Sequence, residues 1–159
     1  MESFSISEIV EMAVRTEHLG YQFYSEMAGR FGSDKDLRRL FETLAEKEKR
    51  HEEIFLALKG HVTPEEPEGR QEAAEYLRAI VESEFFLGKE KSLPAMKDIK
   101  TVARAVAFAL GFEKETLLFY AGLRDAVKEK NTLDAIIIEE RSHIVWLKGF
   151  KQGGTASSV

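Results

Sequence analysis

Two short patterns of potential metal ligands each occur twice in the sequence, about ninety residues apart. Each copy consists of a single glutamate followed by a Glu-x-x-His motif. The six residues are Glu17, Glu48, His51, Glu113, Glu140 and His143. Four carboxylates and two imidazoles in a two-fold repeat are the ligand set expected for two metal ions held inside a helical bundle. The spacing of the Glu-x-x-His pairs supports this, because residues three apart lie on one face of a helix.

The apolar residues around these ligands recur in steps of three and four, which is typical of amphipathic helices. Each ligand interrupts one of four such stripes, with apolar residues before and after it. The second stripe, for example, reads Leu37, Phe41, Leu44, Glu48, His51, Phe55 and Leu58. We therefore expect four helices that direct all six ligands into a shared core.

Four buried carboxylates need a compensating charge, because burial and mutual repulsion disfavour their ionised forms. The four stripes contain no Lys or Arg. Two divalent cations with neutral imidazoles would balance the site. The alternative is a buried Glu–His hydrogen-bond network in a metal-free bundle.

The whole chain fits a single all-α domain. It has 159 residues, three Pro and no strand-like alternation. The absence of Cys excludes disulfides, thiolate zinc sites and iron–sulfur ligation. We expect no nucleic-acid partner, since the formal net charge is −5 and no basic stripe occurs. No membrane-spanning run and no secretory signal are visible, so we expect a cytoplasmic protein.

The helices are expected to form two antiparallel hairpins within a domain at 1–152, followed by a flexible tail at 153–159. Ser5-x-x-Glu8 is typical of a capping box that opens the first helix. The expected helices run from this box to about Phe31, from Ser33 or Asp34 to near Gly60, over 69–85, from near Asp98, and from Asn131–Thr132. A connection of about forty residues, containing the short 69–85 helix, links the hairpins.

Residues equidistant from a hairpin turn lie at the same level. The midpoint of Glu17 and Glu48 is position 32.5, which coincides with the Gly32-Ser33 break. The midpoint of Glu113 and Glu140 is 126.5, whereas the next break is expected near Asn131. That difference amounts to roughly 6 Å along each helix. It requires either a stagger or a third long helix that ends earlier.

These residues resemble the rubrerythrin branch of the ferritin-like superfamily, over nearly the whole chain apart from the tail. The likeness rests on Glu17 with Phe23-Tyr24, Glu48-x-x-His51, Glu113 with Phe119-Tyr120, and Glu140-x-x-His143. It implies a ferritin-like four-helix bundle with one long crossover. It also implies two iron ions, with manganese possible, bridged by two of the glutamates. The implied bridging ligands are Glu48 and Glu140, the terminal carboxylates are Glu17 and Glu113, and His51 and His143 each complete one ion.

The resemblance further implies a non-haem diiron oxidoreductase that reacts with peroxide, oxygen or Fe(II), and a homodimer. Two departures from the family pattern bear on the reaction. Complete rubrerythrins carry a cysteine-ligated rubredoxin domain, so this chain would need an external electron donor. They also carry an extra Glu where this chain has Thr116, and Glu115 points about 160° away from the ligand face. The reaction and the physiological metal therefore stay open, as do iron storage without turnover and an interaction module with a vestigial site.

Several nearby residues have more than one interpretation. Tyr24 and Tyr120 follow Glu17 and Glu113 by seven residues and would lean back towards them. They either bond ligand carboxylates or simply pack in the core. His18, His61 and Glu139 are expected at the surface. The Phe85-Phe86-Leu87 cluster would close the bundle end or face a second subunit.

Overall fold

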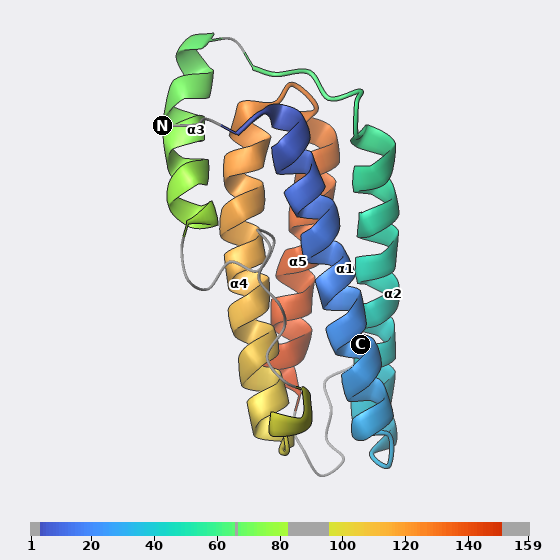
Figure 1. The fold of residues 1–159 in the computed structure, drawn as a ribbon. Coiled ribbons are helices and arrows are strands. Elements are labelled where there is room, and N and C mark those ends of the chain that lie inside the picture. Colours follow the sequence, from blue (N-terminus) through green and yellow to red (C-terminus); the bar gives the residue numbers. More distant parts are fainter. Residues whose placement is uncertain (1–3, 66, 83–95, 151–159) are drawn as a thin grey trace.

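The computed structural model describes residues 4–65, 67–82 and 96–150, and this part of the chain is helical (Figure 1). Its elements are α1 (Ile6–Arg30), α2 (Lys35–Leu58), α3 (Pro67–Val81), a 3₁₀ turn (Met96–Asp98), α4 (Val102–Ala126) and α5 (Lys130–Gly149). The antiparallel pairs α1–α2 and α4–α5 form the bundle, and α3 packs against α4. The predicted all-α bundle of two hairpins with an extra helix in the crossover is confirmed.

Side-chain caps define where the bundle helices begin. Ser5 and Glu8 form the predicted reciprocal capping box at the start of α1. Asp34 accepts hydrogen bonds from the backbone N–H groups of Asp36 and Leu37, each at 3.1 Å, and so opens α2. Thr101 caps α4 by accepting from the Arg104 N–H at 3.2 Å. These bonds satisfy amide groups that have no partner inside the helix.

Helix boundaries differ from the sequence predictions at several places. Helix α4 begins at Val102 rather than near Asp98, because the chain first makes the 3₁₀ turn and is then capped by Thr101. Helix α4 also ends at Ala126, before the break expected near Asn131. The break therefore covers residues 127–129, within three residues of the 126.5 midpoint of Glu113 and Glu140, which removes most of the expected offset. Helix α3 runs over Pro67–Val81 rather than 69–85, and α5 begins at Lys130.

Two predictions concern parts of the chain that the structure does not describe. The Phe85-Phe86-Leu87 cluster and the 153–159 tail both lie outside the described residues.

The crossover is fixed to the turn between α4 and α5 by backbone bonds. The Glu65 N–H donates to the Ala126 carbonyl at 2.8 Å, and the Lys128 N–H donates to the Thr63 carbonyl at 2.9 Å. These bonds form an isolated antiparallel bridge between Pro64 and Val127. The long connection therefore closes one end of the bundle before it enters α3.

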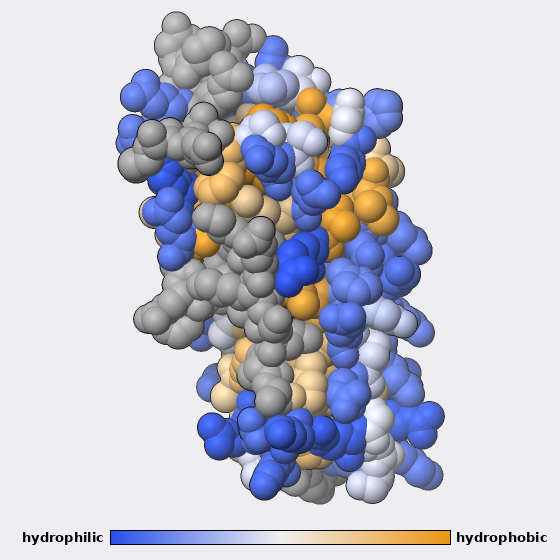
Figure 2. All heavy atoms as spheres, in the orientation of Figure 1, coloured by the Kyte–Doolittle hydropathy of each residue, from blue (hydrophilic) through white to orange (hydrophobic). Residues whose placement is uncertain are grey.

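Two apolar clusters fill the bundle on either side of a polar layer. One contains Phe55, Phe119 and Leu123, and the other contains Phe41 and Leu44. All five side chains are essentially buried. Figure 2 shows hydrophilic side chains over much of the visible surface along α2, with smaller hydrophobic areas between the helices. Among the described residues, no helix combines the length and apolar character needed to cross a bilayer.

Candidate metal centre

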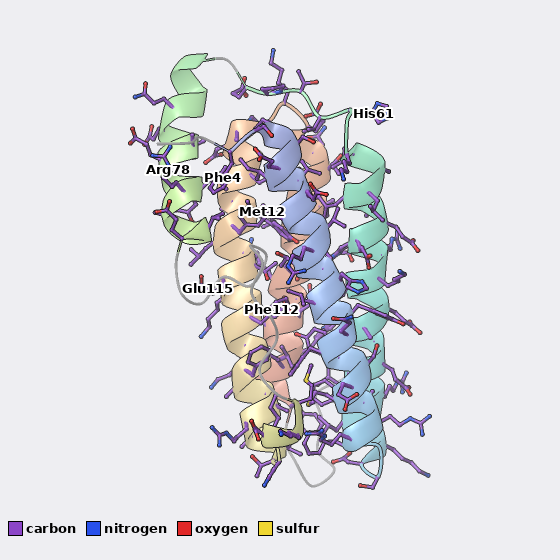
Figure 3. The ribbon with its side chains drawn as sticks, viewed as in Figure 1. Phe4, Met12, His61, Arg78, Phe112 and Glu115 are labelled. Atoms are coloured by element: carbon purple, nitrogen blue, oxygen red, sulfur yellow. The ribbon has the colours of Figure 1, made fainter. Side chains whose placement is uncertain are left out.

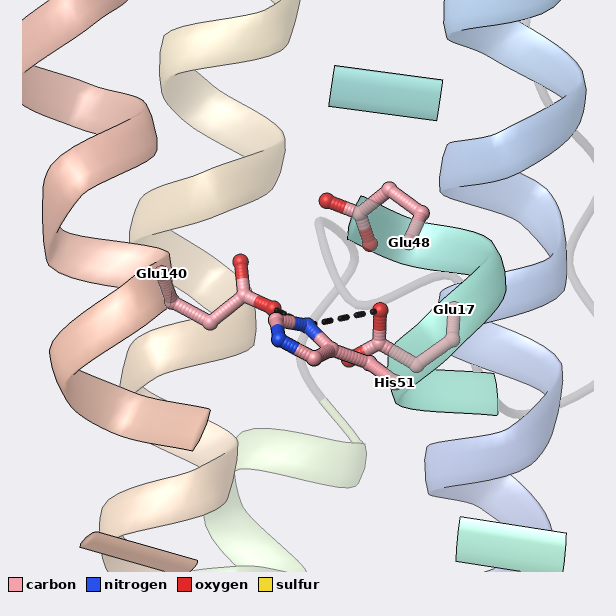
Figure 4. A group of neighbouring side chains, drawn as sticks. All are labelled: Glu17, Glu48, His51 and Glu140. Atoms are coloured by element: carbon pink, nitrogen blue, oxygen red, sulfur yellow. Dashed lines mark hydrogen bonds and ion pairs between the residues drawn. The ribbon is translucent and has the colours of Figure 1, made fainter. Parts of the chain in front are cut away.

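All six predicted ligands meet in the polar layer, where each is at most 1% exposed. They form two overlapping groups, within each of which the potential ligand atoms lie no more than 4.8 Å apart. One group is Glu17, Glu48, His51 and Glu140, and the other is Glu48, Glu113, Glu140 and His143. Figure 4 shows the first group converging from α1, α2 and α5. Glu48 and Glu140 belong to both groups, as the bridging carboxylates of a dinuclear site would.

A glycine makes room for one of the shared carboxylates. Gly20 is buried in α1, one turn beyond Glu17. A Cβ atom at this position would lie 2.9 Å from Glu48 Oε2 and 3.1 Å from Phe112 Cε1. Both distances are shorter than ordinary contacts of about 3.5–4.0 Å. The Glu48 carboxylate therefore occupies space that any larger residue at position 20 would take.

Each core tyrosine binds a carboxylate of the opposite hairpin. The Tyr24 hydroxyl donates to Glu113 Oε1 at 2.5 Å, and the Tyr120 hydroxyl donates to Glu17 Oε1. The predicted bond between each tyrosine and a ligand carboxylate is present, but the acceptor is not the glutamate of the tyrosine's own helix. Seven residues span about 10 Å along a helix, whereas the neighbouring hairpin presents a carboxylate directly opposite. Burial and the nearby carboxylates raise both tyrosine pKa values, so the hydroxyls remain protonated donors.

Many buried atoms of this layer have no hydrogen-bond partner. They are the Oε2 atoms of Glu17, Glu113 and Glu140, both carboxylate oxygens of Glu48, and both ring nitrogens of His143. His143 Nδ1 does lie 3.1 Å from Glu140 Oε2, but the pair lacks the geometry of a hydrogen bond. Buried polar atoms are rarely left unpaired in folded proteins. Free acceptor atoms of O and N type, directed at a common centre, therefore fit a pair of bound metal ions.

Protons are the competing occupants of the layer. Burial, reinforced by repulsion from Glu140 and Glu17, raises the pKa of Glu48 well above its usual value. Burial opposes charge on His51, but its hydrogen bond to Glu140 and its 3.6 Å ion pair with Glu17 outweigh that effect and raise its pKa to about 11. The pKa of His143 rises to about 10 through the same balance, with Glu140 as the strongest partner. Two imidazolium groups can thus offset carboxylate charge without metal, as in the metal-free Glu–His network that is the alternative to a metal site.

The comparisons with known proteins agree with this geometry. The sequence profile of the rubrerythrin family matches residues 8–151, which is most of the chain. The chain belongs to the rubrerythrin family.

A solved structure supports the fold of this rubrerythrin-family chain. It is a 2.30 Å crystal structure from Thermotoga maritima, provisionally described as a ferritin-like diiron-carboxylate protein. The two chains align with a TM-score of 0.70 over 98% of this chain and 99% of that one, at 24% sequence identity. No curated protein matches this sequence significantly.

Thr116, where the family resemblance implies an extra glutamate, contributes no carboxylate to the ligand groups. Its hydroxyl donates to the Phe112 carbonyl at 2.8 Å, one turn back in α4. Glu115 does not replace that carboxylate, because it lies on the outer side of α4 (Figure 3). Among the described residues, this rubrerythrin-family site therefore offers six ligand side chains rather than seven.

The residues expected at the surface divide into two kinds. His61 is exposed at the end of α2 (Figure 3), and the His18 side chain is 47% exposed and pairs with Glu52 at 3.3 Å. Glu139 was expected only at the surface, but it also contacts a ligand histidine. Its side chain is 37% exposed, yet Oε2 lies 3.2 Å from His51 Nε2. Sequence reasoning missed this contact because it joins α5 to α2, and nothing in the spacing within one helix reports it.

Proposed function

We propose that this chain holds two iron ions and acts as a non-haem diiron oxidoreductase of the rubrerythrin type. The observation that carries the proposal is the pair of buried ligand groups that share Glu48 and Glu140. Carboxylate-rich sites with some imidazole suit iron or manganese better than structural zinc. Iron bound here would supply one-electron chemistry towards peroxide, oxygen or Fe(II) as substrate.

The six ligand side chains divide between two metal positions in this proposal. Glu17 and His51 would hold one ion, and Glu113 and His143 would hold the other, with the shared glutamates contacting both. In each terminal carboxylate one oxygen is held by a tyrosine and Oε2 is left for metal. The tyrosines therefore orient ligands, as partners outside a metal's coordination shell commonly do.

The apolar clusters on both sides of the layer complete the arrangement. They keep the four carboxylates at 0% exposure, so bulk water does not compete for them. A site of low polarity strengthens the attraction between a cation and its ligands. Metal binding at these ligands would displace the protons that the metal-free site retains on Glu48 and the two imidazoles.

Two alternatives are each favoured by one observation. Iron binding without turnover is favoured by Thr116, because the site lacks the additional carboxylate of complete rubrerythrins. A vestigial site is favoured by the raised pKa values of His51 and His143, because protonated imidazoles can neutralise the carboxylates.

Metal analysis of the purified chain after reconstitution with Fe(II) tests whether the chain binds two iron ions. We expect two irons per chain with ferric absorption in the near ultraviolet, and loss of iron in Glu48→Gln. Glu46→Gln is the matched control, since Glu46 is exposed on the same helix. Only trace iron in the unaltered protein would refute the proposal and favour the vestigial site.

Peroxide consumption with a supplied reductant separates catalysis from storage. Sustained turnover by the loaded protein supports the oxidoreductase, whereas iron retention in a large assembly without turnover supports storage. We also propose an external electron donor, because this chain has no Cys to hold a rubredoxin iron. A homodimer is proposed as well, and sedimentation of the loaded protein would test it.

A further inference from the structure

The two halves of the internal repeat carry opposite charges at the position before each Glu-x-x-His motif. Lys47 precedes the first Glu-x-x-His motif, and Glu139 precedes the second. The structure brings these two residues together, with Lys47 Nζ 3.5 Å from Glu139 Oε2. A strictly symmetric repeat would place two like charges there. The substitution of opposite charges therefore makes the two halves of the site chemically different.

The difference reaches one of the two histidines. His51 has a carboxylate at each nitrogen, with Nδ1 2.6 Å from Glu140 Oε1 and Nε2 3.2 Å from Glu139 Oε2. His143 has no hydrogen-bond partner at Nε2, and its ring lies beside that of Trp146, with 5.6 Å between the ring centroids. His51 is therefore held from behind by an anion, whereas His143 is packed without one.

A carboxylate behind a histidine ligand fixes the orientation of the ring and makes the ligating nitrogen more basic. Removing such a partner typically lowers metal affinity about 10–100-fold. Glu139 is partly exposed and is also paired with Lys47, so solvent and that cation weaken its pull on His51. The lower end of the range, about 10-fold, is therefore the appropriate expectation here.

We propose that Glu139 is a positioning residue that makes the two metal positions unequal. The position served by Glu17 and His51 binds its ion first and more tightly than the position served by Glu113 and His143. This inference rests on the proposed function, because it requires that both positions bind metal.

Titration of the metal-free protein with diamagnetic Zn(II), followed by calorimetry and by NMR of ¹⁵N-labelled histidine, tests the inference. In the unaltered protein the His51 signals should respond to the first equivalent and the His143 signals to the second. In Glu139→Ala the first step should weaken about 10-fold with the second step unchanged. Glu139→Gln keeps a hydrogen-bond acceptor without the charge. Its affinity in the first binding step should therefore lie between those of the unaltered protein and Glu139→Ala.

Glu46→Gln, which alters one exposed charge on α2, is the control and should leave both steps unchanged. Equal filling of both positions in the unaltered protein would overturn the inference. So would an equal loss of both steps in Glu139→Ala, because that result indicates a general disturbance of the bundle. Failure of the unaltered protein to bind Zn(II) at all would instead refute the proposed function, because N/O sites bind Zn(II) more tightly than Fe(II).

Discussion

Replacement of Gly20 by alanine tests how closely the shared carboxylate is packed. The added Cβ would lie 2.9 Å from Glu48 Oε2, 3.0 Å from Glu48 Cδ and 3.1 Å from Phe112 Cε1. Relative to ordinary contacts, these atoms must give way by about 0.5 Å. In the metal-free protein the Glu48 carboxylate is the end of a flexible side chain and can swing aside. The gain in helix propensity from Gly to Ala, about 1 kcal/mol, offsets part of the remaining cost.

Bound metal removes that freedom because it fixes the carboxylate. The cost of overpacking, about 1–3 kcal/mol, then appears in the binding free energy. This corresponds to a loss of metal affinity of roughly 5- to 150-fold. We therefore expect Gly20→Ala to change the free energy of unfolding of the metal-free protein by less than about 1 kcal/mol, while metal binding weakens strongly.

Gly29→Ala provides the matched control in the same helix. Gly29 is exposed, and a Cβ there would meet nothing within 4 Å. It should stabilise the protein by about 0.5–1 kcal/mol and leave metal affinity unchanged. Urea denaturation of the metal-free proteins and calorimetric titration with Mn(II) measure the two quantities. Equal metal affinities for Gly20→Ala and Gly29→Ala would refute the reasoning about Glu48.

Three further predictions concern the metal-free protein. Tyr24→Phe leaves Glu113 Oε1 without its donor, so denaturant titration should show a loss of about 1–3 kcal/mol, and an unchanged midpoint would contradict the bond. Glu48 and His51 both have raised pKa values, so the folded state binds their protons more tightly than the unfolded state does. The His51 contribution is complete below its unfolded pKa of 6.5 and is lost as pH rises towards about 11. The melting temperature should therefore fall between pH 6 and 10, and a rise over that interval would count against this electrostatic account. Asp34→Ala removes the cap of α2 and should cost about 1 kcal/mol in denaturant titration without altering Mn(II) affinity, so a loss of affinity would show that the cap acts on the site.

The parts of the site that the sequence could predict depend on short-range periodicity. Glu48 and His51 are three residues apart on one apolar stripe, and helical geometry alone places them on the same inward face. The midpoint at Gly32-Ser33 likewise placed Glu17 level with Glu48. Both inferences need only the regular rise and rotation of a helix.

Contacts between hairpins could not be predicted in the same way. Tyr24 meets Glu113 rather than Glu17, because the choice depends on the lateral packing of α1 against α4. Glu139 reaches His51 for a similar reason, since the two residues are 88 positions apart in sequence. The start of α4 was misplaced because Asp98 and Thr101 are both acceptable caps, and only the tertiary structure selects Thr101.

The crossed tyrosine bonds also have a consequence for the order of folding. They connect residues 89 and 103 positions apart, whereas contacts within each hairpin join residues much closer in sequence. Closing long loops costs more chain entropy, so we expect each hairpin to form before the two dock. Neither hairpin alone contains a complete ligand group. Metal should therefore bind only after the hairpins have docked, so that it stabilises the folded state but not the folding transition state. Bound ions should then slow unfolding while leaving the rate of folding nearly unchanged.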